Sequence, residues 1–227
     1  MKLGLISDIH SDLRALKKAL DLLHEQGVEK IVCLGDMVEK GTDGDAVVRL
    51  LQECQIPCVL GNHDEAASSN QRWLREHGDL EHPAMRVRLL AEDVLDYLQN
   101  LPFSLRYVWK NKDKRVSVLL VHGTPTSNVD YLFSNSQPEK YKHIARVADA
   151  DVIIFGHTHT PTRAFFDETW FFNPGAVWGE SSQKRVRLSQ GDWLCPSRTC
   201  ATLSLPGCEF SLFDVDTGNS IEIPLIQ

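Results

Sequence analysis

The sequence predicts an α/β fold in which buried strands alternate with amphipathic helices. Short apolar runs without polar alternation occur at 2–7, 30–35, 56–61, 116–121 and 152–155, a pattern typical of strands buried on both faces. Helical spacings of three and four residues separate several of these runs. Strands that alternate with helices in this way indicate a layered α/β sandwich.

The first two helices are expected between the first three strands. Leucines recur at helical spacing over 13–23, with Ser11 as the expected N-cap and Gly27 as the expected stop. A second apolar pattern, over 47–51, predicts a helix that ends before Pro57. Both helices would cover a sheet with their apolar faces.

Two further helices are expected later in the chain. One apolar stripe predicts a single helix over 83–101, bounded by proline at both ends, and a shorter pattern predicts another over 144–148. The segment 65–101 is the longest insertion between the polar strand ends described below, and we expect it to form a helical cap beside the site.

The last quarter of the chain has a different pattern. After residue 170 short strands are expected, the last two joined by a hairpin at 216–219, whereas the polar stretch 179–208 is typical of a solvated loop. No linker, repeat or low-complexity tract divides the chain, so we expect one domain over 1–227.

Composition narrows the cellular context. The formal charge of −7 argues against binding to anionic membranes and disfavours long nucleic acids as partners. No apolar run has the length of a membrane span or a signal peptide, and six cysteines are expected to be free thiols in a cytoplasmic protein. A structural zinc site at Cys195, Cys200 and Cys208 would lack an evident fourth ligand.

Side chains of the metal-binding type follow all five strands. In open α/β sheets, loops at the carboxyl ends of neighbouring strands converge on one site. Five of the nine histidines belong to this set, which an unrelated scatter of polar residues would not produce. The set is Asp8, His10, Asp36, Asn62, His63, His122, His157 and His159.

The chemistry of these side chains predicts a pair of metal ions. Carboxylates, imidazoles and an amide without any thiolate suit Mn²⁺, Fe, Zn²⁺ or Ni²⁺ better than Ca²⁺ or Mg²⁺. These side chains are too many for one ion. Seven of them would fill two metal sites if one carboxylate were shared. We therefore expect two divalent transition-metal ions, with Mn²⁺ as the leading candidate.

These motifs resemble the five-block signature of the calcineurin-like metallophosphoesterases, and the compact size resembles their small bacterial and archaeal phosphodiesterase branch. The resemblance covers residues 3 to about 176, and an Asn-Pro-Gly turn at 173–175 also matches. It implies a sandwich of two mixed β-sheets flanked by helices. The matching blocks are Asp8-x-His10, Gly35-Asp36, Gly61-Asn62-His63-Asp64, His122-Gly123 and Gly156-His157-Thr158-His159.

The resemblance also implies a role for each matching residue. Asp8, His10 and His159 would hold one ion, Asn62, His122 and His157 the other, and Asp36 would bridge them. His63 would face the substrate and protonate or stabilise the leaving oxygen while a metal-bridging hydroxide attacks phosphorus directly. The role of Asp64 stays open.

The leading functional hypothesis is hydrolysis of a small phosphate ester, either a phosphodiester, a phosphomonoester or a nucleotide polyphosphate. A non-catalytic scaffold on the same fold is the alternative, although His63 and all seven ligand-type residues are present. A binuclear hydrolase of non-phosphate substrates is a third hypothesis, which the Gly-Asn-His-Asp block disfavours. The oligomeric state, a homo-oligomer included, is left open.

Overall fold

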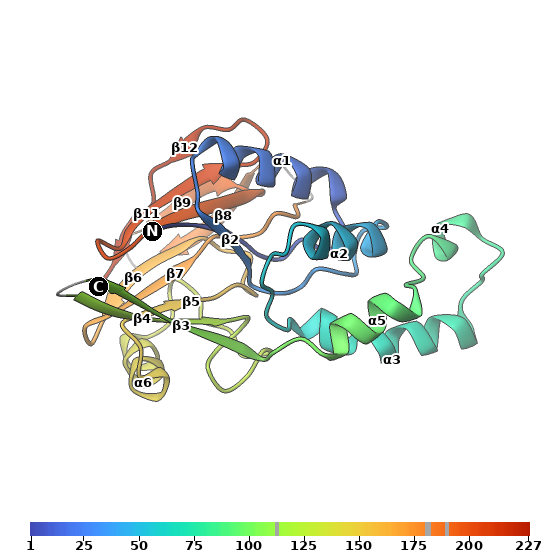
Figure 1. Cartoon of the computed structure of the whole chain (residues 1–227), viewed down its shortest axis with the longest axis horizontal. Coiled ribbons are helices and arrows are strands. Elements are labelled where there is room, and N and C mark those ends of the chain that lie inside the picture. The colour runs from blue at the N-terminus through green and yellow to red at the C-terminus, as the bar shows by residue number, and fades with distance from the viewer. Residues whose placement is uncertain (112–113, 180–182, 189–190) are drawn as a thin grey trace.

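The computed structural model of the chain describes residues 1–111, 114–179, 183–188 and 191–227. Two β-sheets pack face to face, and helices cover the outer face of each (Figure 1). This arrangement confirms the predicted α/β sandwich of two mixed sheets flanked by helices.

The first sheet has β1 near its centre, paired in parallel with β2 and antiparallel with β10. Along β1, Leu3 and Leu5 face the second sheet, whereas Ile6 faces the helices, as the period of two requires. Its strand order is β12 (Ser220–Ile221), β11 (Glu209–Asp214), β10 (Thr199–Ser204), β1 (Lys2–Ile6) and β2 (Lys30–Cys33).

The second sheet has β5 at its centre, parallel to both β4 and β7. All three residues of β5 are buried, as expected for a strand covered on both faces. Its strand order is β13 (Leu225–Ile226), β6 (Thr162–Phe166), β7 (Thr169–Asn173), β5 (Val152–Ile154), β4 (Lys114–Val121) and β3 (Ser104–Asn111).

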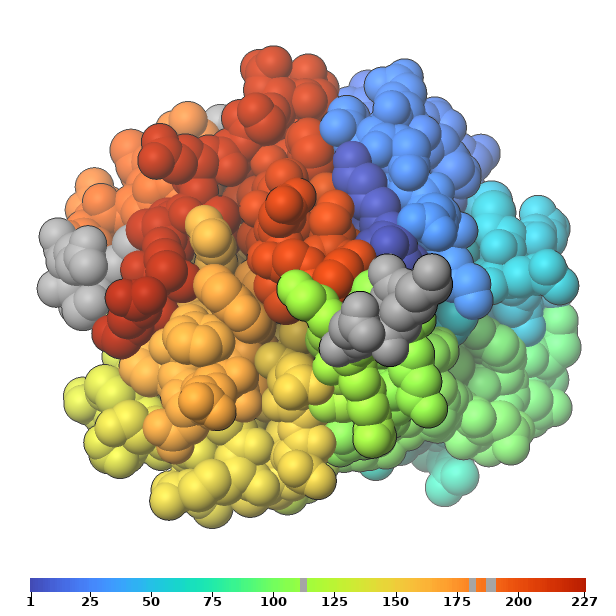
Figure 2. Space-filling model, turned by 60° about the vertical axis from the view of Figure 1, so that its left-hand side comes forward, coloured from blue at the N-terminus to red at the C-terminus, as the bar shows by residue number. Residues whose placement is uncertain are grey.

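The part of the chain that is described contains six helices. In Figure 1, α1 lies above the first sheet and α2 beside it, α6 lies below the second sheet, and α3 to α5 extend to the right. Figure 2 shows the opposite end, where the first residues of the chain lie beside the segment around β10 and β11 and beside the β3–β4 hairpin. The helices are α1 (Leu13–Glu25), α2 (Gly44–Glu53), α3 (Asn62–His77), α4 (Pro83–Arg86), α5 (Glu92–Gln99) and α6 (Pro138–Ala148).

The predicted N-cap of α1 is wrong by one residue. Ser11 has a left-handed φ of 60°, and its carbonyl accepts from Asp43 N at 3.2 Å. Asp12 is the cap instead, because its Oδ1 accepts a hydrogen bond from Ala15 N at 2.9 Å. Gly27 does follow the helix, with a φ of 69° that suits glycine.

The predicted strand over 56–61 is reduced to a single bridge. Cys58 pairs in parallel with Cys33, flanked by hydrogen bonds from Cys33 N to Pro57 O and from Val59 N to Cys33 O. The ladder does not continue, because β2 ends at Cys33 and the chain then turns toward the polar loop that begins at Gly35.

The single helix predicted over 83–101 is also wrong. Its middle is unwound because side chains from other elements bind the backbone there: Gln71 Oε1 accepts from Leu90 N, and Asp45 Oδ1 accepts from Ala91 N. Two helices, α4 and α5, take its place, and the apolar stripe is broken at Val87, which is half exposed.

The loop predicted over 179–208 is wrong for most of the described residues of this stretch, because β8 (Gln183–Leu188) pairs antiparallel with β9 (Gly191–Pro196) and β10 follows. Residues 180–182 and 189–190 of the predicted loop lie outside the described residues. The hairpin predicted at 216–219 is present, since Leu212 pairs with Ile221 across it. All six cysteines are free thiols, and no group of metal-ligating side chains among the described residues includes one.

Candidate metal centre

The carboxyl ends of strands from both sheets converge on one place. Asp8 follows β1 and Asp36 follows β2 in the first sheet, while His122 follows β4 and His157 follows β5 in the second. The site therefore lies across the edge where the two sheets meet, and all eight residues predicted from the sequence lie on its loops or at the start of α3. Seven of them, all except Asn62, form three overlapping groups of possible ligands.

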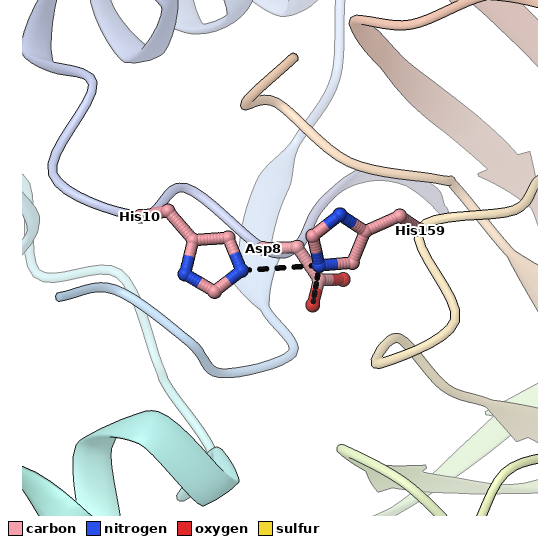
Figure 3. Close-up of side chains that lie close together, drawn as sticks. All are labelled: Asp8, His10 and His159. Carbon is pink, nitrogen blue, oxygen red and sulfur yellow. Dashed lines mark hydrogen bonds and ion pairs between the residues drawn. The ribbon is translucent and has the colours of Figure 1, made fainter. Parts of the chain in front are cut away.

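The first group is Asp8, His10 and His159, whose ligand atoms lie within 4.8 Å of one another. Figure 3 shows the two imidazoles pointing toward each other with the carboxylate beside them. His10 Nε2 lies 3.0 Å from His159 Nε2, which lies 3.3 Å from Asp8 Oδ1. Two imidazole nitrogens and a carboxylate oxygen that converge in this way form a donor set for a divalent cation.

The second group is Asp36, His122 and His157. His122 Nε2 lies 3.3 Å from Asp36 Oδ2 and 3.0 Å from the amide oxygen of Asn62, so Asn62 joins this group. The other ring nitrogen of His122 donates to Leu34 O at 2.7 Å, which fixes the orientation of the ring.

Asp36 faces both groups. Its Oδ2 lies 3.3 Å from His122 Nε2 in the second group and 3.8 Å from His10 Nε2 in the first. Its Oδ1 is held by the backbone N–H of His63 at 2.9 Å. One carboxylate oxygen is thus fixed by the backbone while the other lies between the two sets of imidazoles.

The backbone around these side chains is strained. Five of the eight predicted residues have positive φ in the left-handed region, which costs on the order of 1–3 kcal/mol each and is concentrated at functional sites in proteins. They are Asp8 (53°), His10 (47°), Asp36 (55°), His157 (65°) and His159 (53°). Hydrogen bonds between loops hold this geometry: Asp8 N donates to Gly35 O, and His10 N donates to Asp36 O.

The electrostatics keep the carboxylates ionised and two imidazoles neutral. Burial would raise the pKa of Asp8, but the neighbouring imidazoles of His159, His122 and His10 together outweigh it and hold that pKa below its ordinary value. Burial lowers the pKa of His10 to about 4 and also lowers the pKa of His157. Burial would also lower the pKa of His122, but Asp36, Asp8 and the carbonyl of Leu34 together outweigh it and raise that pKa to about 9. A divalent cation satisfies such a set, because it takes the place of the imidazole proton between anionic oxygens.

Two buried polar atoms support a cation here. Among the described residues, Asp8 Oδ1 and His157 Nε2 are buried side-chain atoms without a hydrogen bond, although Asp8 Oδ1 lies 3.3 Å from His159 Nε2. A buried polar group that lacks a hydrogen bond costs about 1–3 kcal/mol, and both residues belong to the ligand groups. The residues present therefore fit divalent metal ions, bound by nitrogen and oxygen.

His63 is held differently from the other histidines. Its Nδ1 lies 2.6 Å from Glu39 Oε2, and this hydrogen bond raises the pKa of His63. Asn70, on α3, donates to the other oxygen of Glu39. His63 also groups with His10 and Asp36, so its ring lies at the edge of the centre. Because Glu39 binds Nδ1, the remaining ring nitrogen of His63 is Nε2.

Asp64, whose role the sequence left open, ties two loops together. Its buried carboxylate accepts hydrogen bonds from four backbone N–H groups, those of Asp36, Met37, Val38 and Gly61, at 2.8–3.3 Å. The loop that carries Asp36 is thereby fixed to the start of α3, which carries Asn62 and His63.

Sequence reasoning missed several residues that line the centre. Glu39 and Lys40 follow Asp36 in the same loop, and Lys40 Nζ lies 3.1 Å from His10 Nε2 and 4.7 Å from the ring centroid of Trp178. Half-buried Lys184, in the stretch expected to be a loop, donates to His159 O. Tyr131 stacks on His157. Only the position of Glu39 and Lys40 directly after a ligand block signalled them in the sequence.

Comparisons with known proteins show what this chain resembles. The model of the calcineurin-like phosphoesterase superfamily domain matches residues 1–189. An uncharacterised protein of Methanocaldococcus jannaschii is 26% identical over 194 residues, 77% of this chain and 75% of that protein. Phosphodiesterase YfcE of Escherichia coli K12 is 26% identical over 178 residues, 78% of this chain and 79% of that protein.

Solved structures share the fold. A metallophosphoesterase from Sphaerobacter thermophilus superposes with a TM-score of 0.66 at 23% identity, covering 99% of this chain and 90% of that chain. At this level of identity the likeness concerns the fold alone.

In the described part of the chain, none of the helices has the length and apolar character needed to cross a membrane.

Proposed function

The chain belongs to the calcineurin-like phosphoesterase superfamily, and from this premise we propose that it is a phosphodiesterase that works with two divalent transition-metal ions. Membership makes it a metallophosphoesterase-type hydrolase, as the sequence predicted. The observation that carries the finer proposal is the pair of buried ligand groups with Asp36 Oδ2 between them.

In this proposal the ligands divide as the two groups suggest. Asp8, His10 and His159 hold one ion, and Asp36 is shared. Asn62, His122 and His157 hold the other. We propose Mn²⁺ as the native metal, because the nitrogen and oxygen donor set without thiolate suits it, although Fe, Zn²⁺ and Ni²⁺ have similar preferences.

When bound, such ions would neutralise negative charge on the phosphoryl oxygens and activate the attacking water. The chain's own contribution is to place a proton donor beside them. His63 is held at Nδ1 by Glu39, which keeps the imidazole oriented and favours its protonated form. Nε2 then donates its proton to the leaving oxygen, a contribution of about 10²- to 10⁴-fold in rate.

The substrate we propose is a small phosphate ester, with diesters preferred and nucleotides included. The relative named phosphodiesterase supports the diester preference. The net charge of −7 disfavours long nucleic acids. We also propose a cytoplasmic location, supported by six cysteines that are all free thiols.

The test compares the metal-loaded wild type with His63→Asn. Bis(p-nitrophenyl) phosphate and p-nitrophenyl phosphate are offered with Mn²⁺, and bound metal is counted in parallel by mass spectrometry. His63→Asn is expected to keep two equivalents of Mn²⁺ while kcat falls by about 10²- to 10⁴-fold. His143→Asn, an exposed histidine on α6, is the matched control and is expected to leave both values unchanged.

Two results would contradict the proposal. A wild-type protein that binds two equivalents of metal and hydrolyses neither ester would favour the non-catalytic scaffold. Loss of one metal equivalent in His63→Asn would make His63 a ligand rather than a proton donor.

A further inference from the structure

Two neighbouring aromatic rings, those of Tyr131 and Phe133, lie beside the candidate metal centre. Tyr131 lies on the imidazole of His157, with ring centroids 4.1 Å apart and planes 21° apart. Phe133 in turn lies nearly parallel to Tyr131, at 5.1 Å and 5°. Both aromatic residues belong to the segment between β4 and α6, so this one segment adds two rings to a residue of the centre.

These rings are unusually exposed for their type. Tyr131 is 46% and Phe133 is 43% exposed, and the neighbouring Val129 is 59% exposed. Neighbouring apolar side chains that are exposed together are typical of binding sites. Their place beside the phosphate site implies a ligand that carries both a phosphate and an apolar, planar group.

The segment is fixed in place before any ligand binds. Tyr141, fully buried in α6, donates from its hydroxyl to Phe133 O at 3.0 Å. Lys140 Nζ donates to Tyr131 O at 2.7 Å. Asn128 donates to Glu65 at 3.0 Å, which ties the segment to α3. A surface held at three points presents its rings with little loss of entropy on binding.

From this geometry we infer that Tyr131 and Phe133 form a subsite for a planar ring, a nucleobase or an aryl group, attached to the phosphodiester. The inference rests on the proposed phosphodiesterase function and narrows its substrate class. The rings bind by stacking, which every base offers, so the subsite distinguishes planar from aliphatic esters rather than one base from another.

The experiment compares three diesters that release the same p-nitrophenolate and differ in the other ester group: thymidine 5′-yl, phenyl and methyl. The measured quantity is the ratio of kcat/KM between each planar ester and the methyl ester, with Mn²⁺ bound. In Tyr131→Ala and Phe133→Ala this ratio is expected to fall on the order of 5- to 100-fold, the effect of one lost base–aromatic stacking contact. The thymidine and phenyl arms separate a nucleobase from an aryl group as the preferred ring.

Two control variants and a second readout make the result specific. Tyr131→Phe keeps the ring and is expected to keep the ratio, and Val129→Ala changes an exposed neighbour without a ring. Calorimetric Kd values for thymidine 5′-monophosphate against methyl phosphate are expected to show the same loss of preference without turnover.

The outcomes separate this inference from the proposed function. Equal losses on all three diesters would make Tyr131 a support for His157 only, and an unchanged ratio in both alanine variants would overturn the subsite. In either case the wild type still hydrolyses the diesters. Failure of the wild type on all three would overturn the proposed function, and with it the substrate class inferred here.

Discussion

Replacing Asp64 by asparagine tests how the loops of the metal centre are held. The carboxylate lies at the start of α3 and is 1% exposed. Oδ2 accepts from Asp36 N at 2.8 Å and Gly61 N at 3.1 Å, and Oδ1 accepts from Met37 N at 2.9 Å and Val38 N at 3.3 Å. Asparagine has almost the same shape but only one acceptor oxygen, so two backbone N–H groups must face an amide that also donates.

The expected cost follows from those two N–H groups. Each buried donor left without an acceptor costs about 1–3 kcal/mol, so Asp64→Asn loses about 2–6 kcal/mol of unfolding free energy. Burial, together with the nearby Asp36 carboxylate, raises the pKa of Asp64 to about 7, so the variant also removes an unfavourable buried charge. That relief places the expected loss in the lower half of the range.

The assay is urea unfolding of the metal-free protein, followed by circular dichroism. With an m-value of about 2–3 kcal/mol/M, the midpoint is expected to fall by on the order of 1–2 M. Asp96→Asn, on the exposed face of α5, is the matched control, and its effect is expected to stay within about 0.5 kcal/mol. A midpoint for Asp64→Asn equal to that of the wild type would refute the role of the four hydrogen bonds.

Three further predictions concern the neighbouring loops and the helical insertion. In Gly61→Ala the added Cβ would lie 2.2 Å from Asp36 Oδ1, so Asp36 must move. Calorimetry is therefore expected to show about 10- to 100-fold weaker Mn²⁺ binding. Unchanged binding would contradict the fixed position of Asp36. Glu39→Gln keeps a hydrogen-bond acceptor for His63 but removes the negative charge of the carboxylate. The kcat is therefore expected to fall about tenfold while the metal content stays unchanged. An unaltered kcat would contradict the role of Glu39 in orienting His63. Leu98→Ala, on the buried face of α5, is expected to lower the free energy of unfolding by about 2–5 kcal/mol. Unfolding is expected to remain one cooperative transition in denaturant. Two separate transitions would contradict the single domain predicted from the sequence.

The candidate site was predictable because its residues stand at strand ends. The apolar runs before Asp8, Asp36, His122 and His157 identify four strands, and topology brings their carboxyl ends together. No contact between distant residues had to be known for this step. The apolar runs and the polar residues that follow them were therefore sufficient to predict most of the site.

The segment 65–101 was expected to be helical, but the start of α3 at Asn62, and with it the helical position of His63, was not predicted, for a physical reason. The sequence of α3 is polar, and its buried residues are Asp64, Ala67 and Gln71, so no apolar stripe announces it. Two of these three are buried to bind backbone groups of other segments, not to fill a core. Helices stabilised by such polar contacts leave little trace in hydrophobic periodicity.

Local propensity also failed where tertiary contacts decide the backbone. The left-handed conformations of His10 and His159 were not predicted, because histidine, although enriched there, adopts a positive φ only in a minority of positions. The same holds at Ala91, which lies inside the single helix predicted over 83–101 but is the N-cap of α5, with its N–H bound to Asp45. The rings beside His157 depend on the path of a loop that periodicity does not describe.

The central claim is that two metal ions lie on either side of Asp36. Anomalous diffraction from Mn²⁺-loaded crystals measures this directly. Two manganese peaks are expected beside the Asp36 carboxylate, one next to Asp8 and His159 and the other next to His122 and His157. A single peak, or two peaks of which neither contacts Asp36, would contradict the account.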